Sequence, residues 1–145
     1  IRAIAAADIP VMGHIGLTPQ SYHRMGGNKV QGRNSGDAAG SKERLLEDAH
    51  AVEQAGACAV VIEAVPASLA ANITEKISIP TIGIGAGADV DGQVLVLHDM
   101  IGMTHEFSPR FLRRYMNLFE DMTKAIGQYV ADVKSVDFPN ANEQY

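Results

Sequence analysis

A chain of 145 residues that is 46% hydrophobic and 20% charged is long enough to bury a core of its own. Its formal net charge of −5 argues against the basic surface that nucleic-acid binding requires. No apolar run approaches the ~18 residues of a membrane span, and no signal peptide is visible. We therefore expect neither nucleic acid nor a membrane among the partners.

The only cysteine, Cys58, lies within an apolar run. We expect it to be a small core residue of a protein in a reducing, cytoplasmic compartment, although a reactive thiol is the alternative. Residues 1–7 resemble the last turns of a helix, which Asp8 and Pro10 end because proline disfavours helical geometry in the residue before it. A start in mid-helix suggests that the chain is the later part of something longer.

The first half of the chain alternates between strand and helix patterns. A short strand over residues 10–14 leads into a long irregular segment, residues 15–40, which is rich in turn formers. Loops of this length inside a compact domain are lids, binding loops or disordered segments. Ser41 is placed to cap a helix that ends at Gly56, and a buried strand follows over residues 57–63.

The second half continues the alternation. Pro66 suits the first turn of a helix, and the strand over residues 80–84 is followed by a turn over 85–92. Residues 94–97 predict a fourth buried strand, and residues 109–136 predict a helix, broken once near residue 118 at most. Alternation of this kind implies a parallel sheet with right-handed crossovers. Four strands would make half of an eight-stranded α/β barrel of ~250 residues.

Glu63 is the residue around which the rest of the chain is organised. It ends the central strand and is followed within three residues by Pro66, which places its side chain at the carboxyl end of the sheet. That edge is where α/β sheets and barrels hold their chemistry. Apolar neighbours there would raise the proton affinity of a carboxylate toward the range of a general base. The alternative is a glutamate in a surface loop just past the strand.

Two histidines also lie near predicted strand ends. His14 ends its strand as Glu63 ends the next one, so both are expected to face the same cavity. A structural histidine is the competing interpretation. His98, followed by Asp99, holds a similar position, and we interpret this pair as structural hydrogen-bonding groups.

A glycine-rich turn matches a phosphate-binding pattern, but the residues around it argue against phosphate binding. Residues 83–88 match the dinucleotide pattern G-x-G-x-x-A, but another strand follows where that pattern needs a helix. Asp89 and Asp91 would also repel phosphate. Without further oxygen ligands these aspartates predict a solvated turn rather than a cation site. The chain has no Cys/His zinc spacing and no nucleophilic triad.

Several motifs together resemble the ketopantoate hydroxymethyltransferase family. They are GHIGLTPQS at residues 13–21, GG at 26–27, KVQGR at 29–33, EAVP at 63–66, IPTIGIGAG at 79–87 and DGQVLVLHD at 91–99. The family often has Glu-Cys-Val-Pro where this chain has EAVP, and residues 34–41 form a longer loop than the family leads us to expect. The resemblance implies a (β/α)8 TIM barrel, of which residues 1–136 supply the C-terminal half, followed by a polar tail, residues 137–145.

The resemblance also implies a reaction. The family transfers a hydroxymethyl group from 5,10-methylenetetrahydrofolate to 3-methyl-2-oxobutanoate with Mg²⁺, and Glu63 falls on its proton acceptor. His14 is expected to line the substrate pocket. The family's metal-ligating acids lie in the first half of the barrel, so we expect no metal ligand in this chain and no activity without that half. The folate-contacting residues are not identified. A homo-oligomer, often a decamer, is implied as well.

Two alternatives from other classes stay open at this point. The chain would fit another barrel enzyme that acts on α-keto acids, such as a lyase that cleaves a C–C bond. It would also fit an inactive half-barrel that acts only in assembly, because an exposed apolar sheet edge drives association.

Overall fold

The computed structural model describes residues 1–36, 40–106 and 108–145, so part of the long loop, residues 37–39, lies outside the described residues. The described chain divides into two compact units, Ile1–Val94 and Leu95–Tyr145. The elements of the first unit are α1 (Arg2–Ala5), β1 (Met12–Gly16), the 3-10 helix η1 (Pro19–Ser21), α2 (Lys42–Gln54), β2 (Ala59–Glu63), α3 (Ala67–Lys76), β3 (Thr81–Ile84) and β4 (Gly92–Gln93).

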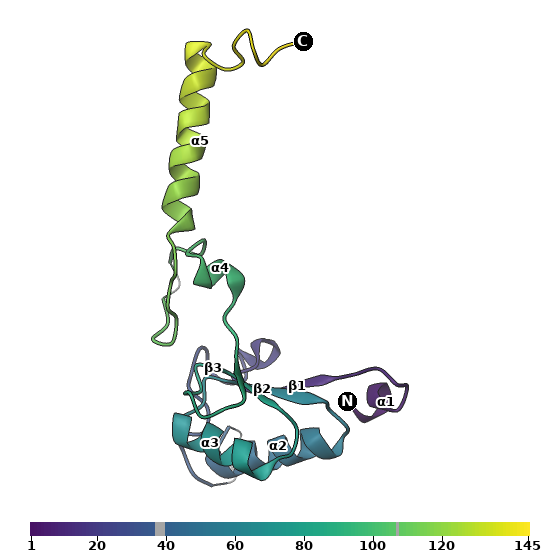
Figure 1. Ribbon diagram of the computed structural model, residues 1–145. Coiled ribbons are helices and arrows are strands. Elements are labelled where there is room, and N and C mark those ends of the chain that lie inside the picture. Colours follow the sequence, from purple (N-terminus) through teal and green to yellow (C-terminus); the bar gives the residue numbers. More distant parts are fainter. Residues whose placement is uncertain (37–39, 107) are drawn as a thin grey trace. The chain divides into compact units, whose positions relative to one another are not determined.

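The four strands of this unit form one parallel sheet in the order β1-β2-β3-β4 (Figure 1). Each strand pairs with the next strand along the chain, and α2 and α3 form the crossovers from β1 to β2 and from β2 to β3. This is the predicted α/β class, and it has the strand order expected of half of an eight-stranded barrel.

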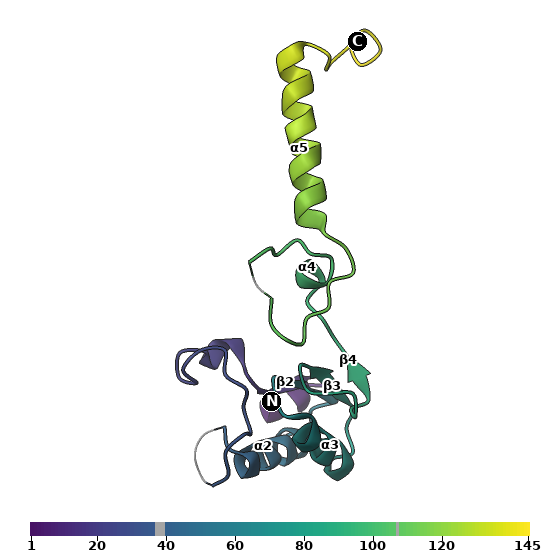
Figure 2. The same ribbon diagram turned by 90° about the vertical axis from the view of Figure 1, so that its left-hand side faces the viewer.

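The helices cover one face of the sheet. In Figures 1 and 2, α2 and α3 lie side by side beneath the strands. Because side chains alternate along a strand, Val60 and Ile62 point to the same face, and both are fully buried. They join Ile73 of α3 and Leu45 of α2 in the core. Burial of this kind stabilises the fold by roughly 1.5–3 kcal/mol for each large aliphatic side chain.

The opposite face of the sheet remains partly open to solvent. His14, Val61 and Glu63 share this face by register, since His14 lies opposite Val61 and Gly16 lies opposite Glu63. None of the three is in the buried class, and Met12 at the start of β1 is 54% exposed. The alternation of burial therefore separates a helix-covered face from a face that carries the candidate catalytic residues.

Most predicted boundaries of this unit are confirmed within two residues. The Oγ of Ser41 accepts a hydrogen bond from Arg44 N at 3.2 Å, as expected of the N-cap of α2. Pro66 is the N-cap of α3 and not its first helical residue. The first strand runs from Met12 to Gly16, two residues later than predicted, so His14 lies inside β1 and not at its end.

Two predictions for the apolar segments were wrong. Cys58 is exposed and precedes β2, and its Sγ donates to the carbonyl oxygen of Val11 at 3.4 Å, so it is not a core residue. The predicted fourth strand over residues 94–97 does not form, because the ladder contains only Gly92–Gln93. Val94, Val96 and Leu97 are 43%, 51% and 58% exposed. An apolar run does not by itself distinguish a buried strand from an exposed connection.

Among the described residues of the second unit, the helices are α4 (Leu97–Met100) and α5 (Leu118–Ser135). The helix predicted over residues 109–136 thus forms only from residue 118. Main-chain bonds explain the late start, since Tyr115 N donates to the carbonyl oxygen of Met100 at 2.8 Å and Leu118 N donates to that of Ile101 at 3.0 Å. No helix among the described residues is long and apolar enough to cross a membrane.

Candidate active site

His14 and Glu63 are brought together on the open face of the sheet. The Nε2 atom of His14 lies 3.0 Å from Oε2 of Glu63, and their side chains are 30% and 22% exposed. β1 contributes His14 and β2 contributes Glu63. The two strands are paired in parallel and run toward the same edge of the sheet. The two side chains thus meet, although of the pair that was expected to face one cavity only His14 lines the cavity beside β1.

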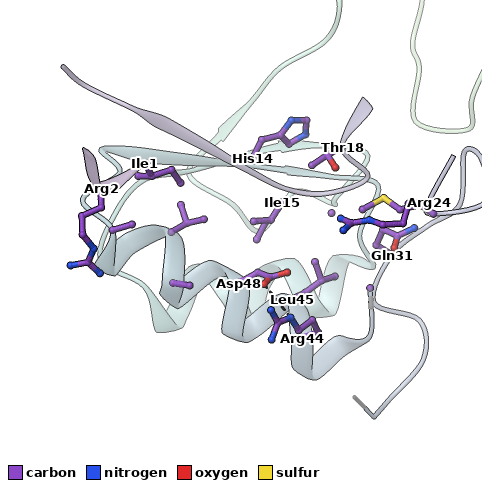
Figure 3. Close-up of a pocket in the computed structure, with 16 residues that line it drawn as sticks. Ile1, Arg2, His14, Ile15, Thr18, Arg24, Gln31, Arg44, Leu45 and Asp48 are labelled. Carbon is purple, nitrogen blue, oxygen red and sulfur yellow. Dashed lines mark ion pairs between the residues drawn. The ribbon is translucent and has the colours of Figure 1, made fainter. Parts of the chain in front are cut away.

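The contact between the two side chains is close but not aligned as a hydrogen bond. Nε2 of His14 is a buried nitrogen without a hydrogen-bond partner among the described residues. Buried polar atoms in this condition are rare in folded proteins and call for a functional or structural explanation. In Figure 3 the imidazole projects to the side of β1 opposite α2, whereas Ile15 projects toward α2.

The main chain at Glu63 is fixed by its neighbours. Leu17 N donates to the carbonyl oxygen of Glu63 at 2.9 Å, directly after β1 ends. Gly16 has φ +88, and a Cβ there would overlap with that same carbonyl oxygen. The sequence thus needs glycine at residue 16, because another side chain would be both strained and in collision.

Ala64 follows Glu63 with φ 51, a left-handed conformation that is uncommon for a residue other than glycine. Ala64 N donates to the carbonyl oxygen of Ile84 on β3, and Ala64 O accepts from Gln31 N, both at 2.9 Å. Nothing in the sequence predicted this geometry, because alanine has no preference for a positive φ. The only signal was the short strand-to-helix turn between Glu63 and Pro66.

A cavity of about 740 Å³ opens beside β1. Its wall combines the first residues of the chain, β1, the long loop and α2, and His14 is the member of the histidine–glutamate pair that lines it (Figure 3). Thr18, Arg24 and Gln31 of the long loop also line it. Sequence patterns singled out the loop as a whole but not these three side chains.

Asp91 has a structural role at the opposite end of β3. Its Oδ2 accepts from Thr81 N at 2.8 Å and from Thr81 Oγ1 at 2.9 Å. These bonds, the main-chain one first, lower the pKa of the Asp91 carboxyl below its ordinary value. Thr81 is fully buried, and its Oγ1 lies 2.9 Å from Oγ1 of Thr74. Asp91 thus joins the starts of β3 and β4.

A second carboxylate joins α2 to the segment that leads from α3 into β3. Oε1 of Glu53 accepts from Ser78 Oγ at 2.6 Å and from Ser78 N at 2.5 Å, and these bonds lower the pKa of the Glu53 carboxyl. His50 lies on the same helix, with Nδ1 3.7 Å from the other carboxylate oxygen. Both contacts lie away from Glu63 and stabilise the scaffold.

Acidic and histidine side chains do not converge on a metal-binding arrangement in this part of the barrel. Across residues 1–36, 40–106 and 108–145, no group of three or more His, Cys, Asp or Glu side chains has the arrangement of a metal site. His98 and Asp99 lie in α4, within the second unit. Residues 83–88 lead from β3 toward β4 without the helix that dinucleotide binding needs.

Comparison with known proteins places the chain in a family. The family model described as ketopantoate hydroxymethyltransferase matches residues 1–141. The chain belongs to the ketopantoate hydroxymethyltransferase family. A relative from Flavobacterium johnsoniae, named 3-methyl-2-oxobutanoate hydroxymethyltransferase, is 61% identical over all 145 residues, which correspond to 52% of its own length. A relative of the same name from Trichlorobacter lovleyi is 57% identical over the whole chain and 53% of its own length.

The chain therefore spans about half the length of the curated relatives it matches. A half-length match fits the sheet, which holds four of the eight strands that a complete barrel requires. The family assignment and the partial barrel thus rest on independent observations.

Proposed function

We propose that this chain is the base-bearing half of an enzyme that transfers a hydroxymethyl group from 5,10-methylenetetrahydrofolate to 3-methyl-2-oxobutanoate, giving 2-dehydropantoate for pantothenate synthesis. The observation that carries the proposal is the place of Glu63 at the carboxyl end of β2, 3.0 Å from His14, in a chain of this family. Barrel enzymes build their active sites at that edge.

The chemistry gives Glu63 a defined task. The C3 proton of an α-keto acid is weakly acidic, so its removal requires a base next to that carbon. Oε2 of Glu63 accepts the proton, and the electron pair of the C3–H bond moves into the enolate. The enolate then attacks the methylene carbon of the folate, and one C–N bond of that carbon breaks as the new C–C bond forms. Water then replaces the remaining folate nitrogen on this carbon, which supplies the hydroxyl group and releases tetrahydrofolate. The Glu63 side chain is 22% exposed, so its carboxylate can meet a substrate without opening the sheet.

His14 is proposed to line the substrate pocket and to hold the carboxylate of Glu63. Its Nε2 lies beside Oε2 of Glu63 and lacks an aligned hydrogen-bond partner among the described residues. An unsatisfied buried nitrogen next to the base supports this role.

The proposed metal is Mg²⁺, which when bound would polarise the keto acid and favour the enolate. Mg²⁺ prefers several oxygen ligands, and Glu63 is the carboxylate that this chain offers on the open face of the sheet. The residues described here do not form a magnesium site by themselves. We therefore place its ligands in the other half of the barrel and assign no step of this chain to it.

The proposed partners follow from the same incomplete sheet. β1 is a terminal strand of the sheet and offers an edge to a further strand. We propose that the first half of a family barrel occupies it, that the complete protein forms a homo-oligomer and that it acts in the cytoplasm. Neither a membrane nor nucleic acid is part of this proposal.

The test uses a fusion in which the first half of the Flavobacterium johnsoniae relative precedes this chain, called the fused enzyme below. It should form 2-dehydropantoate from 3-methyl-2-oxobutanoate, 5,10-methylenetetrahydrofolate and Mg²⁺, as the intact relative does under the same conditions. Cleavage of an α-keto acid without folate would instead indicate a lyase. A folded but inactive fusion, next to an active relative, would reject the proposal for this chain.

A further inference from the structure

The main-chain carbonyl groups of Glu63 and of the residue after it, Ala64, both accept hydrogen bonds from the two ends of one loop. The carbonyl oxygen of Glu63 accepts from Leu17 N, and the carbonyl oxygen of Ala64 accepts from Gln31 N, each at 2.9 Å. Leu17 and Gln31 stand at the two ends of residues 18–30. The loop is therefore closed on consecutive carbonyl groups, directly at the candidate base.

The conformation of Ala64 makes this arrangement possible. In a regular parallel ladder the N–H and C=O groups of one residue bind the same neighbouring strand. Ala64 departs from this rule, since its N–H binds Ile84 of β3 and its carbonyl oxygen binds Gln31 of the loop that follows β1. The left-handed φ of 51 turns the carbonyl group away from β3. A strained residue beside a candidate base points to function, because the rest of the structure must hold it there.

The loop end that binds Ala64 is itself well anchored. Gln31 is 8% exposed, and its Nε2 donates to the carbonyl oxygen of Lys29 at 2.9 Å. Its neighbour Gly32 donates from N to the carbonyl oxygen of Gly40 at 2.7 Å. Figure 3 shows Thr18, Arg24 and Gln31 of this loop lying near one another beyond His14. Gln31 thus transmits the position of the loop to the main chain of Glu63 and Ala64.

We infer that Ala64 and the Gln31 main chain are positioning elements that set the direction of the Glu63 carboxylate toward the substrate through the left-handed turn. This inference rests on the proposed function, in which Glu63 removes the C3 proton. Reactions of this kind are sensitive to displacements of a base by about 1 Å. A change that moves the turn should therefore slow proton removal and leave substrate affinity nearly unchanged.

The experiment compares Ala64→Gly with Ala64→Val in the fused enzyme. Glycine tolerates a positive φ, whereas a β-branched residue opposes it. The readout is deuterium uptake at C3 of 3-methyl-2-oxobutanoate in D₂O, without folate, as kcat and KM. We expect the valine variant to lose at least about tenfold in kcat with KM changed by less than about twofold, and the glycine variant to retain the kcat of the parent within about threefold.

A second pair of variants serves if Ala64→Val fails to fold. Gln31→Pro removes the N–H that binds Ala64, and Asn28→Ala, a change at an exposed residue of the same loop, is the control. Gln31→Pro should lower kcat at least about tenfold, and Asn28→Ala should lower it by less than about threefold. Equal rates in all four folded variants would overturn the positioning role.

Failure of the proposed function would give a different result from failure of the positioning role. If Glu63→Gln kept full deuterium uptake, the base would be wrong whatever the Ala64 variants do. The positioning geometry would then be judged by amide hydrogen exchange. Protected Leu17 and Gln31 amides that lose protection in Ala64→Val support the turn, and unprotected amides in the parent contradict it.

Discussion

Nε2 of His14 and Oε2 of Glu63 lie 3.0 Å apart although the two residues belong to different strands. The register of β1 and β2 explains the meeting, since Gly16 is opposite Glu63 and His14 lies on the same face two residues earlier. Gly16 has no side chain, so the Glu63 carboxylate can extend back along β1 toward the imidazole. A histidine thereby becomes the neighbour of the candidate base.

Replacement of His14 tests whether this contact matters for chemistry. In the fused enzyme, His14→Ala should slow deuterium uptake at C3 of 3-methyl-2-oxobutanoate by about 10- to 100-fold, because the carboxylate loses the group beside it. The exposed His98 of α4 gives a matched control, and His98→Ala should leave the rate unchanged. Equal rates for both alanine variants would remove His14 from the site.

Thr81 tests the network at the start of β3. Thr81→Val keeps the shape of a fully buried side chain but removes the hydroxyl that bonds to Asp91 and lies next to Thr74 Oγ1. The free energy of unfolding should fall by about 1–3 kcal/mol in urea titrations. Thr123→Val on the exposed face of α5 is the control and should change stability by less than about 0.5 kcal/mol. A similar small change at Thr81 would show that the network contributes little.

The lowered pKa of Asp91 predicts a pH dependence of stability. A carboxyl whose pKa is lower in the folded state stabilises the fold above its unfolded pKa, and this contribution is lost as pH falls through the folded pKa. Asp91→Asn should therefore be less stable than the parent near pH 6, and the difference should shrink below about pH 4. Glu53 also has a lowered pKa but is present in both proteins. A difference independent of pH from 6 to 2 would contradict the assignment.

Gly16 tests how tightly the main chain of Glu63 is held. Gly16→Ala places a Cβ against the carbonyl oxygen of Glu63 and strains a φ of +88, so stability should fall by at least about 1–2 kcal/mol. Gly127 in α5 has nothing within 4 Å of its would-be Cβ, and Gly127→Ala should stabilise the helix by about 0.5–1 kcal/mol. Thermal unfolding of the two variants should shift in opposite directions. A tolerated alanine at residue 16 would show that β1 and β2 can separate at this edge.

The sequence patterns found the elements that have strong local signals. β2 combines an apolar run with a following proline, and α2 has a capping serine and a terminal glycine, so both were predicted within two residues. The placement of Glu63 at a strand end followed from the same signals. The approach of His14 to Glu63 was expected from parallel strand ends, but the distance required the register of the sheet.

The errors occurred where burial depends on distant parts of the chain. Residues 94–97 are as apolar as a core strand, yet three of them are exposed. Cys58 lies just before β2 and is exposed, so it is not part of the core. No local pattern could indicate this exposure. The positive φ of Ala64 is likewise invisible in sequence, because it is imposed by bonds to Ile84 and Gln31.

The most direct test of the account is the rate of deuterium uptake at C3 of 3-methyl-2-oxobutanoate by the fused enzyme and its Glu63→Gln variant. Mass spectrometry of the keto acid in D₂O with Mg²⁺ and without folate isolates proton removal from the later transfer. We expect rapid uptake by the parent and a loss of at least about 100-fold in the variant, whose fold should be intact. Equal uptake by both proteins would contradict the assignment of Glu63 as the base.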